Sequence, residues 1–121
     1  MADVPIEKLK LMITVVDRGR GEGLSEKLRQ AGCYLNFVLL GDGTADTALM
    51  DMLGLSEKRK DVVITLMRAS RAREILGMVD RALELNTPGN GIAFTIPFSS
   101  VGGQKTYQLL ANLRAGSAGG K

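Results

Sequence analysis

The sequence predicts an α+β fold, a ferredoxin-like βαββαβ sandwich in which two helices cover one face of a four-stranded antiparallel sheet. Two observations lead to this expectation. Apolar residues alternate along four short segments, and two further segments repeat apolar residues every three or four positions. Their order is strand, helix, strand, then strand, helix, strand, so the chain consists of two similar halves. A length of 121 residues is typical of one domain.

The first half begins with a strand and a helix. Residues 9–16 alternate as a strand, and one of its faces carries Leu9, Leu11, Ile13 and Val15. A helix of about ten residues should follow, because apolar residues recur at helical spacing from Leu24 to Ala31. Gly32 supplies its C-terminal stop.

The second strand and a connection occupy the middle of the chain. Residues 34–40 are expected to form the strand, which ends at Gly41-Asp42-Gly43. Within 44–60 we expect a short amphipathic helix closed by Gly54, with apolar positions at Ala45, Ala48, Leu49, Met52 and Leu53.

The second half repeats the pattern. Residues 61–67 are rich in Val, Ile and Leu and predict the third strand, after which Ser70 can cap a helix. The apolar stripe of this helix is the most regular in the chain: Ala72, Ile75, Leu76, Val79, Ala82 and Leu83. Residues 86–90 end the helix, and 91–97 alternate as the fourth strand. The expected organisation is a domain over 1–98, an extension over 99–114 that packs on the domain or on a neighbouring subunit, and a disordered tail over 115–121.

Two helices cover only one face of such a sheet. The face left open is predicted to carry Lys10, Met12, Thr14, Val16, Asn36, Val38, Leu40, Ala93 and Thr95. This set is too apolar for a surface that faces water, so we expect an oligomer packed through the open sheet face.

Four connections meet at one end of the predicted sheet. They are residues 17–23, 41–43, 58–60 and 89–91, and they bring together Arg18, Arg20, Lys58, Arg59 and Lys60 without an equal number of acids. Backbone amides in glycine turns and nearby cations favour an anion at that end. The simpler interpretations are a mobile surface loop over 19–23 and turn glycines at 89 and 91 that need only a positive φ.

Composition excludes several function classes. The 121 residues include no His and one Cys, which leaves few ligands for zinc, copper or iron and no usual general base. An enzyme is therefore not expected. The net charge of +3 is spread along the chain and only 4% of residues are aromatic, so nucleic acid is not favoured as a partner. Cys33 is expected to be buried, and a cytoplasmic location is expected.

Two motifs resemble those of the P-II nitrogen-regulator superfamily. Val38-Leu39-Leu40-Gly41-Asp42-Gly43 is similar to the end of the family's second strand and the base of its T-loop, and Gly89-Asn90-Gly91-Ile92-Ala93-Phe94 resembles its phosphate-binding B-loop. The resemblance covers roughly residues 9–97. It implies trimers of ferredoxin-like subunits that bind nucleotides in the clefts between them. This chain differs in having Ile92 where the family has the B-loop lysine, Ala45 where it has the T-loop glutamine, and no Tyr in the 44–60 connection.

The resemblance implies a non-catalytic trimeric regulator that binds an anionic small molecule, an ATP-, ADP- or AMP-type nucleotide, and regulates a membrane transporter or a metabolic enzyme. The expected ligand-binding residues are Gly41, Asp42, Gly43, Thr44, Gly89, Asn90, Gly91, Ile92, Arg18, Arg20 and Lys60. Two alternatives stay open: a structural or assembly trimer without a small-molecule ligand, and a nucleic-acid binder that uses the basic end.

Overall fold

The computed structural model describes residues 8–42, 48, 59–98, 100, 102–107 and 109. Its elements are β1 (Leu9–Asp17), α1 (Gly21–Gln30), β2 (Leu35–Asp42), β3 (Arg59–Arg68), the 3-10 turn η1 (Ala69–Arg71), α3 (Ala72–Leu83) and β4 (Ile92–Pro97). This is the βαββαβ order, so the fold class predicted from the sequence is confirmed.

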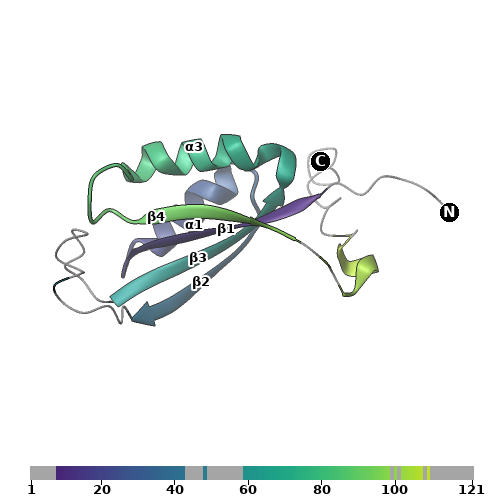
Figure 1. The fold of residues 1–121 in the computed structure, drawn as a ribbon, viewed down its shortest axis with the longest axis horizontal. Coiled ribbons are helices and arrows are strands. Elements are labelled where there is room, and N and C mark those ends of the chain that lie inside the picture. Colours follow the sequence, from purple (N-terminus) through teal and green to yellow (C-terminus); the bar gives the residue numbers. More distant parts are fainter. Residues whose placement is uncertain are drawn as a thin grey trace.

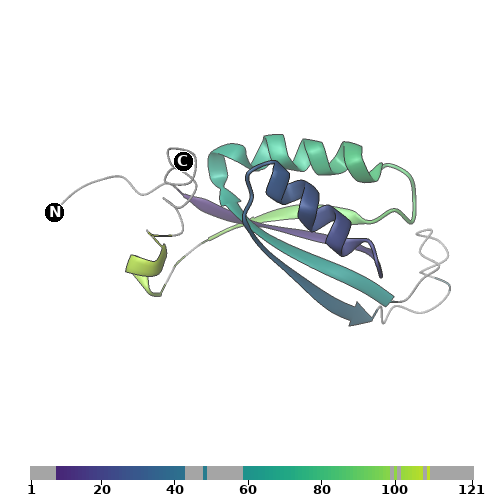
Figure 2. The ribbon, with the colours of Figure 1, turned by 180° about the vertical axis from the view of Figure 1, so that it is seen from behind.

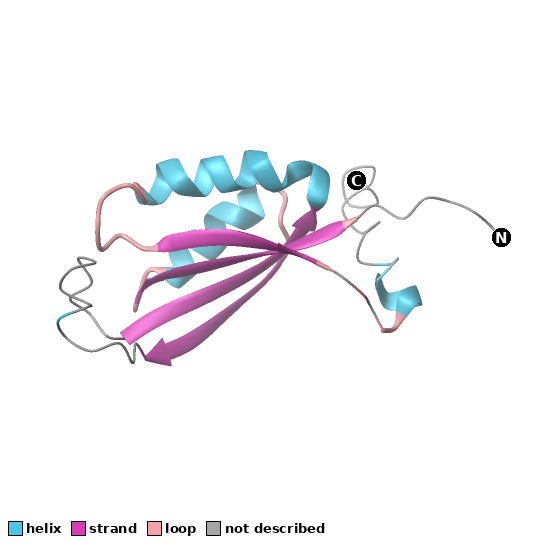
Figure 3. Ribbon diagram, in the orientation of Figure 1, coloured by secondary structure: helices cyan, strands magenta, loops and turns pink. Residues whose placement is uncertain are grey.

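The four strands form one antiparallel sheet in the order β2-β3-β1-β4. Both helices lie on the same side of it (Figures 1 and 3), and the view from behind shows the same arrangement (Figure 2). β2 and β4 are therefore the two edge strands. The turn after β1, the end of β2, the start of β3 and the start of β4 lie at one end of the sheet, as expected.

The helices end as predicted but one begins differently. α1 is followed by Gly32 with a φ of 98°, and the N–H of Cys33 donates to the carbonyl of Leu28 at 2.8 Å. Ser70 does not cap α3. It lies in η1, so Arg71 occupies the N-cap position and no side chain caps the helix. The prediction for Ser70 was wrong because the chain enters α3 through a tight turn that the apolar pattern does not reveal.

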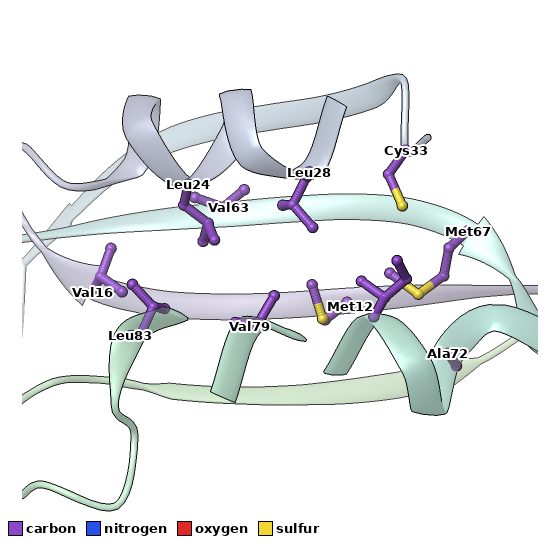
Figure 4. Close-up of a cluster of buried hydrophobic side chains, with 11 residues drawn as sticks. Met12, Val16, Leu24, Leu28, Cys33, Val63, Met67, Ala72, Val79 and Leu83 are labelled. Carbon is purple, nitrogen blue, oxygen red and sulfur yellow. The ribbon is translucent and has the colours of Figure 1, made fainter. Parts of the chain in front are cut away.

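The core lies between the sheet and the two helices (Figure 4). Its buried members are Met12, Val16, Leu24, Leu28, Cys33, Val63, Met67, Ala72, Ile75, Val79 and Leu83. Cys33 is 3% exposed, in agreement with its predicted burial. Two threonines, Thr14 and Thr65, are fully buried on this side of the sheet, and Thr65 donates to the Asn36 side chain at 2.8 Å.

The two faces of the sheet are exchanged relative to the sequence prediction. Met12 and Val16 belong to the core beneath the helices, and register places the rest of the predicted open face on that side: Lys10, Thr14, Asn36, Val38, Leu40, Ala93 and Thr95. Both faces of β1 carry apolar residues, so alternation alone does not say which one meets the helices. A shift of one residue exchanges every side chain between the faces.

The face opposite the helices is more apolar than the one predicted. The residues on it are Leu11, Ile13, Val15, Leu35, Phe37, Leu39, Val62, Ile64, Leu66, Ile92, Phe94 and Ile96. Toward the two edges these side chains are strongly exposed, with Phe37 at 55% and Ile92 at 58%. Among the described residues, therefore, no helix covers this apolar face, which is built from the other set of residues.

Some predicted features lie outside the described residues. They are the helix expected within 44–60, apart from Ala48, together with Gly43, Thr44 and Lys58, and the tail over 115–121. Within the part of the chain that is described, no helix has the length and apolar character needed to cross a membrane.

Candidate functional site

Arg18 lies where three segments of the chain meet. Its Nη2 donates to the carbonyl of Gly41 at 2.8 Å, and its Nε lies 3.5 Å from the carboxylate of Asp61. Its backbone N–H donates to the carbonyl of Arg59 at 3.1 Å. The guanidinium therefore connects the turn after β1 to the end of β2 and the start of β3. This internal role was not expected for a residue predicted to contact a ligand.

Asp61, a residue of β3, has its side chain at the N-terminal end of α1. Its side chain is only 6% exposed, and Oδ2 accepts hydrogen bonds from the backbone N–H groups of Gly19 and Gly21, both at 2.9 Å. A carboxylate at this position is favourable, because the first amides of a helix lack partners and carry partial positive charge. A Cβ at Gly21 would lie 2.9 Å from both Asp61 Oδ2 and Val38 Cγ1, so a larger residue would require one of these side chains to shift.

The glycine-rich segment 19–23 is thus neither an open anion cradle nor a loop over its whole length. Gly21 and Gly23 belong to the first turn of α1, and two amides of the segment bind the subunit's own carboxylate. The expected surface loop is limited to residues 18–20.

Lys60 forms an ion pair with Asp17 across the same end of the sheet. The Nζ atom lies 2.6 Å from Asp17 Oδ1, and the lysine side chain is 11% exposed. Asp42 adds a third carboxylate, 3.9 Å from Arg18 Nη2. Three aspartates therefore offset part of the expected excess of cations at this end. Arg20 and Arg59 are both exposed, and none of the described residues forms a hydrogen bond or ion pair with the Arg20 guanidinium.

The turn before β4 has the backbone shape predicted from its glycines. Gly89 has a φ of 90° and Gly91 a φ of 127°. Between them, the Asn90 side chain donates to the carbonyls of Leu83 and Glu84 at 3.0 and 3.1 Å. The first bond gives the Leu83 carbonyl a partner at the C-terminal end of α3, whereas the Glu84 carbonyl also accepts from the N–H of Thr87 at 3.0 Å. Asn90 therefore has a structural role in the subunit.

A groove of about 450 Å³ lies between α3 and β4 and is bordered by Gly91 and Ile92. Its other lining residues are Arg73, Leu76, Gly77, Asp80, Leu85 and Ala93. This volume is within the range of small-molecule sites. The lining is mainly apolar, with one cation and one carboxylate. Gly77 removes a side chain from the middle of α3, although glycine costs about 1 kcal/mol there relative to alanine.

The two glycine turns do not form one pocket within a subunit. Gly41 and Gly91 lie at the same end of the sheet but on opposite edge strands, separated by β3 and β1. Three strand spacings amount to about 14 Å. Gly41 is also part of β2 and pairs with Lys60, so the strand continues one residue beyond it to Asp42. Gly41 therefore does not line the groove that Gly91 borders.

The sequence interpretation missed the groove residues on α3. Only the apolar stripe of this helix was described, and Arg73, Gly77 and Asp80 were not proposed as site residues. The one local signal was Gly77, an unfavourable residue within an otherwise regular helical pattern. Asp61 was placed in a strand and was not counted among the charges at the end of the sheet.

Solved structures with a similar fold include two P-II proteins. The B. subtilis GlnK-ATP complex aligns with a TM-score of 0.57 and 14% identity, over 85% of this chain and 93% of that one. Arabidopsis thaliana PII bound to citrate aligns with a TM-score of 0.57 and 14% identity, over 77% and 79%. A DUF3240 family protein from Shewanella baltica aligns with a TM-score of 0.58 and 8% identity, over 78% and 94%.

A larger protein contains the same fold as a part. The Bacillus cereus protein related to NIF3 aligns with a TM-score of 0.57 and 17% identity over 82% of this chain, which spans only 27% of that protein. No protein-family model and no curated protein sequence matches the chain. At these identities the likeness establishes the fold. The P-II-like fold expected from the two motifs is thereby confirmed.

Proposed function

We propose that the protein is a non-catalytic P-II-like signalling protein that binds an anionic small molecule, an adenine nucleotide, between subunits and regulates a partner such as a membrane transporter or a metabolic enzyme. The observation that carries the proposal is the groove between α3 and β4, because Gly91 and Ile92 on its border belong to the segment that resembles the P-II phosphate loop. Two neighbours in fold are bound to polyanions, ATP in one and citrate in the other. The absence of His from the sequence supports a binding role rather than catalysis.

The groove has the chemistry that a nucleotide requires. Leu76, Leu85 and Ala93 supply an apolar surface for a base. The exposed guanidinium of Arg73 can bind a phosphate, and charge-assisted hydrogen bonds of this kind are the stronger ones. The carboxylate of Asp80 can accept a hydrogen bond from an adenine amino group or a ribose hydroxyl. Gly91 of the 89–91 turn lies at the same border.

A second subunit is needed to add the turn at residues 41–43, since Gly41 lies at the other edge of its own sheet. The proposed assembly is a homotrimer. Its formation is supported by the apolar sheet face opposite the helices and by the exposed apolar side chains on both edge strands. Of the three cations predicted to contact the ligand, Arg20 forms no ion pair with a described residue, whereas Arg18 and Lys60 pair with Asp61 and Asp17.

The proposal includes an organisation of the subunit into a domain and a C-terminal extension. The domain spans 1–98, and the extension after it packs on the domain. Tyr107 supports this packing: its hydroxyl accepts a hydrogen bond from the N–H of Leu9 at 2.9 Å, and its ring lies edge-on to Phe98 with centroids 5.7 Å apart. We place the protein in the cytoplasm.

Sedimentation equilibrium at micromolar concentration should give a mass three times that of the subunit. The physical reason is the large apolar area that a lone subunit exposes to water. A subunit mass that persists across this concentration range would contradict the proposed trimer.

Isothermal titration calorimetry against ATP, ADP, AMP and cyclic dinucleotides should show at least one saturable ligand. Arg73→Ala should then weaken binding of that ligand about tenfold or more, because a hydrogen bond from a cation to phosphate contributes about 1.5–3 kcal/mol. Arg29→Ala is the matched control. Arg29 is also an exposed cation on a helix, but it lies on α1 and does not line the groove, so the affinity should change little. Flat titrations with all ligands would refute the nucleotide.

A second candidate is an assembly trimer with no small-molecule ligand. It is favoured by the structural roles of the 89–91 turn, in which Asn90 caps α3 and Gly91 lies close to β1. Flat titrations combined with an intact trimer would select this alternative. Gly91→Ala does not separate the two candidates, because it disturbs the subunit itself. Arg73→Ala does separate them, since Arg73 is exposed and lines the groove, so its loss should weaken ligand binding without unfolding the subunit.

A further inference from the structure

Both edge strands lack the features that normally protect the edge of a sheet. Proteins usually block such edges with lysine, proline, short strands or bulges. β2 pairs with β3 over eight uninterrupted positions, and its one charged residue is the terminal Asp42. β4 carries no charge and has proline only at its last position, Pro97. Apolar side chains on both strands are exposed: Phe37, Val38, Leu39 and Leu40 on β2, and Ile92, Phe94 and Ile96 on β4.

The directions of the two edges allow one to pair with the other. β2 is antiparallel to β3, β3 to β1, and β1 to β4, so β2 and β4 run in opposite directions. If β2 of one copy lies beside β4 of the next, the antiparallel sheet continues across the subunits. Contacts between two different edges are heterologous, and repeated around an axis they close into a ring.

On the helix side of the sheet, an exposed side chain projects from β2, whereas β4 borders the groove. Leu40 pairs with Asp61 and thus lies on the helix side of the sheet, yet it is 71% exposed. At the other edge, Ala93 lies on the helix side of β4 and lines the groove beneath α3. A strand added to β4 would place its own helix-side residues along this groove.

The position of Leu40 along the strand also matches the groove. Leu40 pairs with Asp61, Asp61 pairs with Val16, and Gly91 follows at the same level because its neighbour Ile92 pairs with Val15. A sheet continued without offset therefore brings Leu40 beside Gly91, and an offset of two residues brings it beside Ala93. Both residues are small, so either register leaves room for the leucine.

We propose that β2 of a neighbouring copy pairs along β4 and that Leu40 of that copy closes the outer side of the groove between α3 and β4. The inference rests on the proposed inter-subunit function and adds to it the residue that completes the cleft. The same pairing brings Gly41 of one copy to the end of the sheet where the next copy has Gly91. The open groove of a lone subunit becomes an enclosed site shared by two.

The first experiment compares Leu40→Asp with Leu109→Asp by sedimentation. Leu40 and Leu109 are 71% and 68% exposed in the subunit, so neither change should unfold it, which far-ultraviolet circular dichroism checks. Leu40→Asp should raise the dissociation constant of the assembly at least a hundredfold, because it would bury a charge against an apolar groove. Leu109→Asp should sediment like the unmodified protein. Equal assembly of both variants would overturn the inference.

The second experiment traps the strand pairing with cysteines in a Cys33→Ala background. Leu40→Cys with Ala93→Cys tests the offset register, and Val38→Cys with Ala93→Cys tests the register without offset. Within one subunit each pair lies on opposite edges, farther apart than a disulfide spans. One of the two pairs should give covalent oligomers on mild oxidation. A covalent dimer from the single Leu40→Cys variant would instead indicate β2 paired with β2 and would contradict the proposal.

The outcomes separate this inference from the proposed function. If the unmodified protein is a monomer, the proposed trimer and the strand pairing both fail. If it is a trimer that neither Leu40→Asp nor the cysteine pairs affect, only the strand pairing fails. Ligand binding by calorimetry is scored independently, so a trimer paired through β2 and β4 that takes no nucleotide supports this inference and rejects the ligand.

Discussion

Replacing Asp61 by alanine is expected to lower the free energy of unfolding by about 3 kcal/mol, because hydrogen bonds to a charged group contribute about 1.5–3 kcal/mol and the change removes two of them. The N–H groups of Gly19 and Gly21 would lose their acceptor at the start of α1, and Arg18 would lose the nearest of its carboxylates. The melting temperature should fall by roughly 10–20 °C for a domain of this size. Chemical denaturation at one fixed protein concentration measures the effect.

Asp42→Ala is the matched control for Asp61→Ala. Asp42 also faces Arg18, but at 3.9 Å and with 79% of its side chain exposed. An exposed pair of this kind contributes about 0–1 kcal/mol, so stability should change little. Asp61→Asn should fall between the two, since the amide oxygen can still accept from the backbone while the charge is lost. If Asp61→Ala were as mild as Asp42→Ala, the capping role of Asp61 would be wrong.

Gly91→Ala is expected to destabilise the subunit by about 2–4 kcal/mol. A Cβ at this position would lie 2.5 Å from the backbone carbonyl oxygen of Val15, and the φ of 127° is one that residues with a side chain rarely adopt. Strained backbone conformations cost about 1–3 kcal/mol each, and the contact with a backbone atom of the central strand adds to that cost. Denaturant unfolding measures this loss of stability, which should lower the midpoint concentration and leave the m-value unchanged.

Gly23→Ala is the control for this prediction and should have the opposite sign. Gly23 lies in α1 with no atom within 4 Å of an added Cβ, so alanine should stabilise the protein by about 0.5 kcal/mol. A neutral Gly91→Ala would show that the turn can move away from β1. In that case the close approach at Gly91 would not explain why glycine is found there.

The order of elements could be predicted because local pattern and local geometry agree. Alternation defined β1, helical spacing defined α1 and α3, and Gly32 ended α1 at the expected place. The choice of sheet face could not be predicted in the same way. β1 has apolar residues on both faces, and Thr14, which looked like a surface residue, is buried beneath the helices.

The candidate site was predicted in part. The 89–91 turn has the expected positive φ angles, and Gly91 and Ile92 border a groove. Arg18 and Lys60 were expected to contact a ligand but instead bind Asp61, Gly41 and Asp17 within the subunit. These partners are about 20 to 45 positions away along the chain, so no local spacing indicates them.

The sequence by itself determined the βαββαβ order and the glycine turns, because hydrophobic period and permitted φ angles are properties of neighbouring residues. Only the tertiary structure decided how the charges are used, which sheet face is left open and that the two glycine turns lie on opposite edges. These depend on strand register and strand order, which bring together residues far apart in sequence. For the same reason the groove beside β4 is visible only in the folded subunit, with Gly77 as its one local sign.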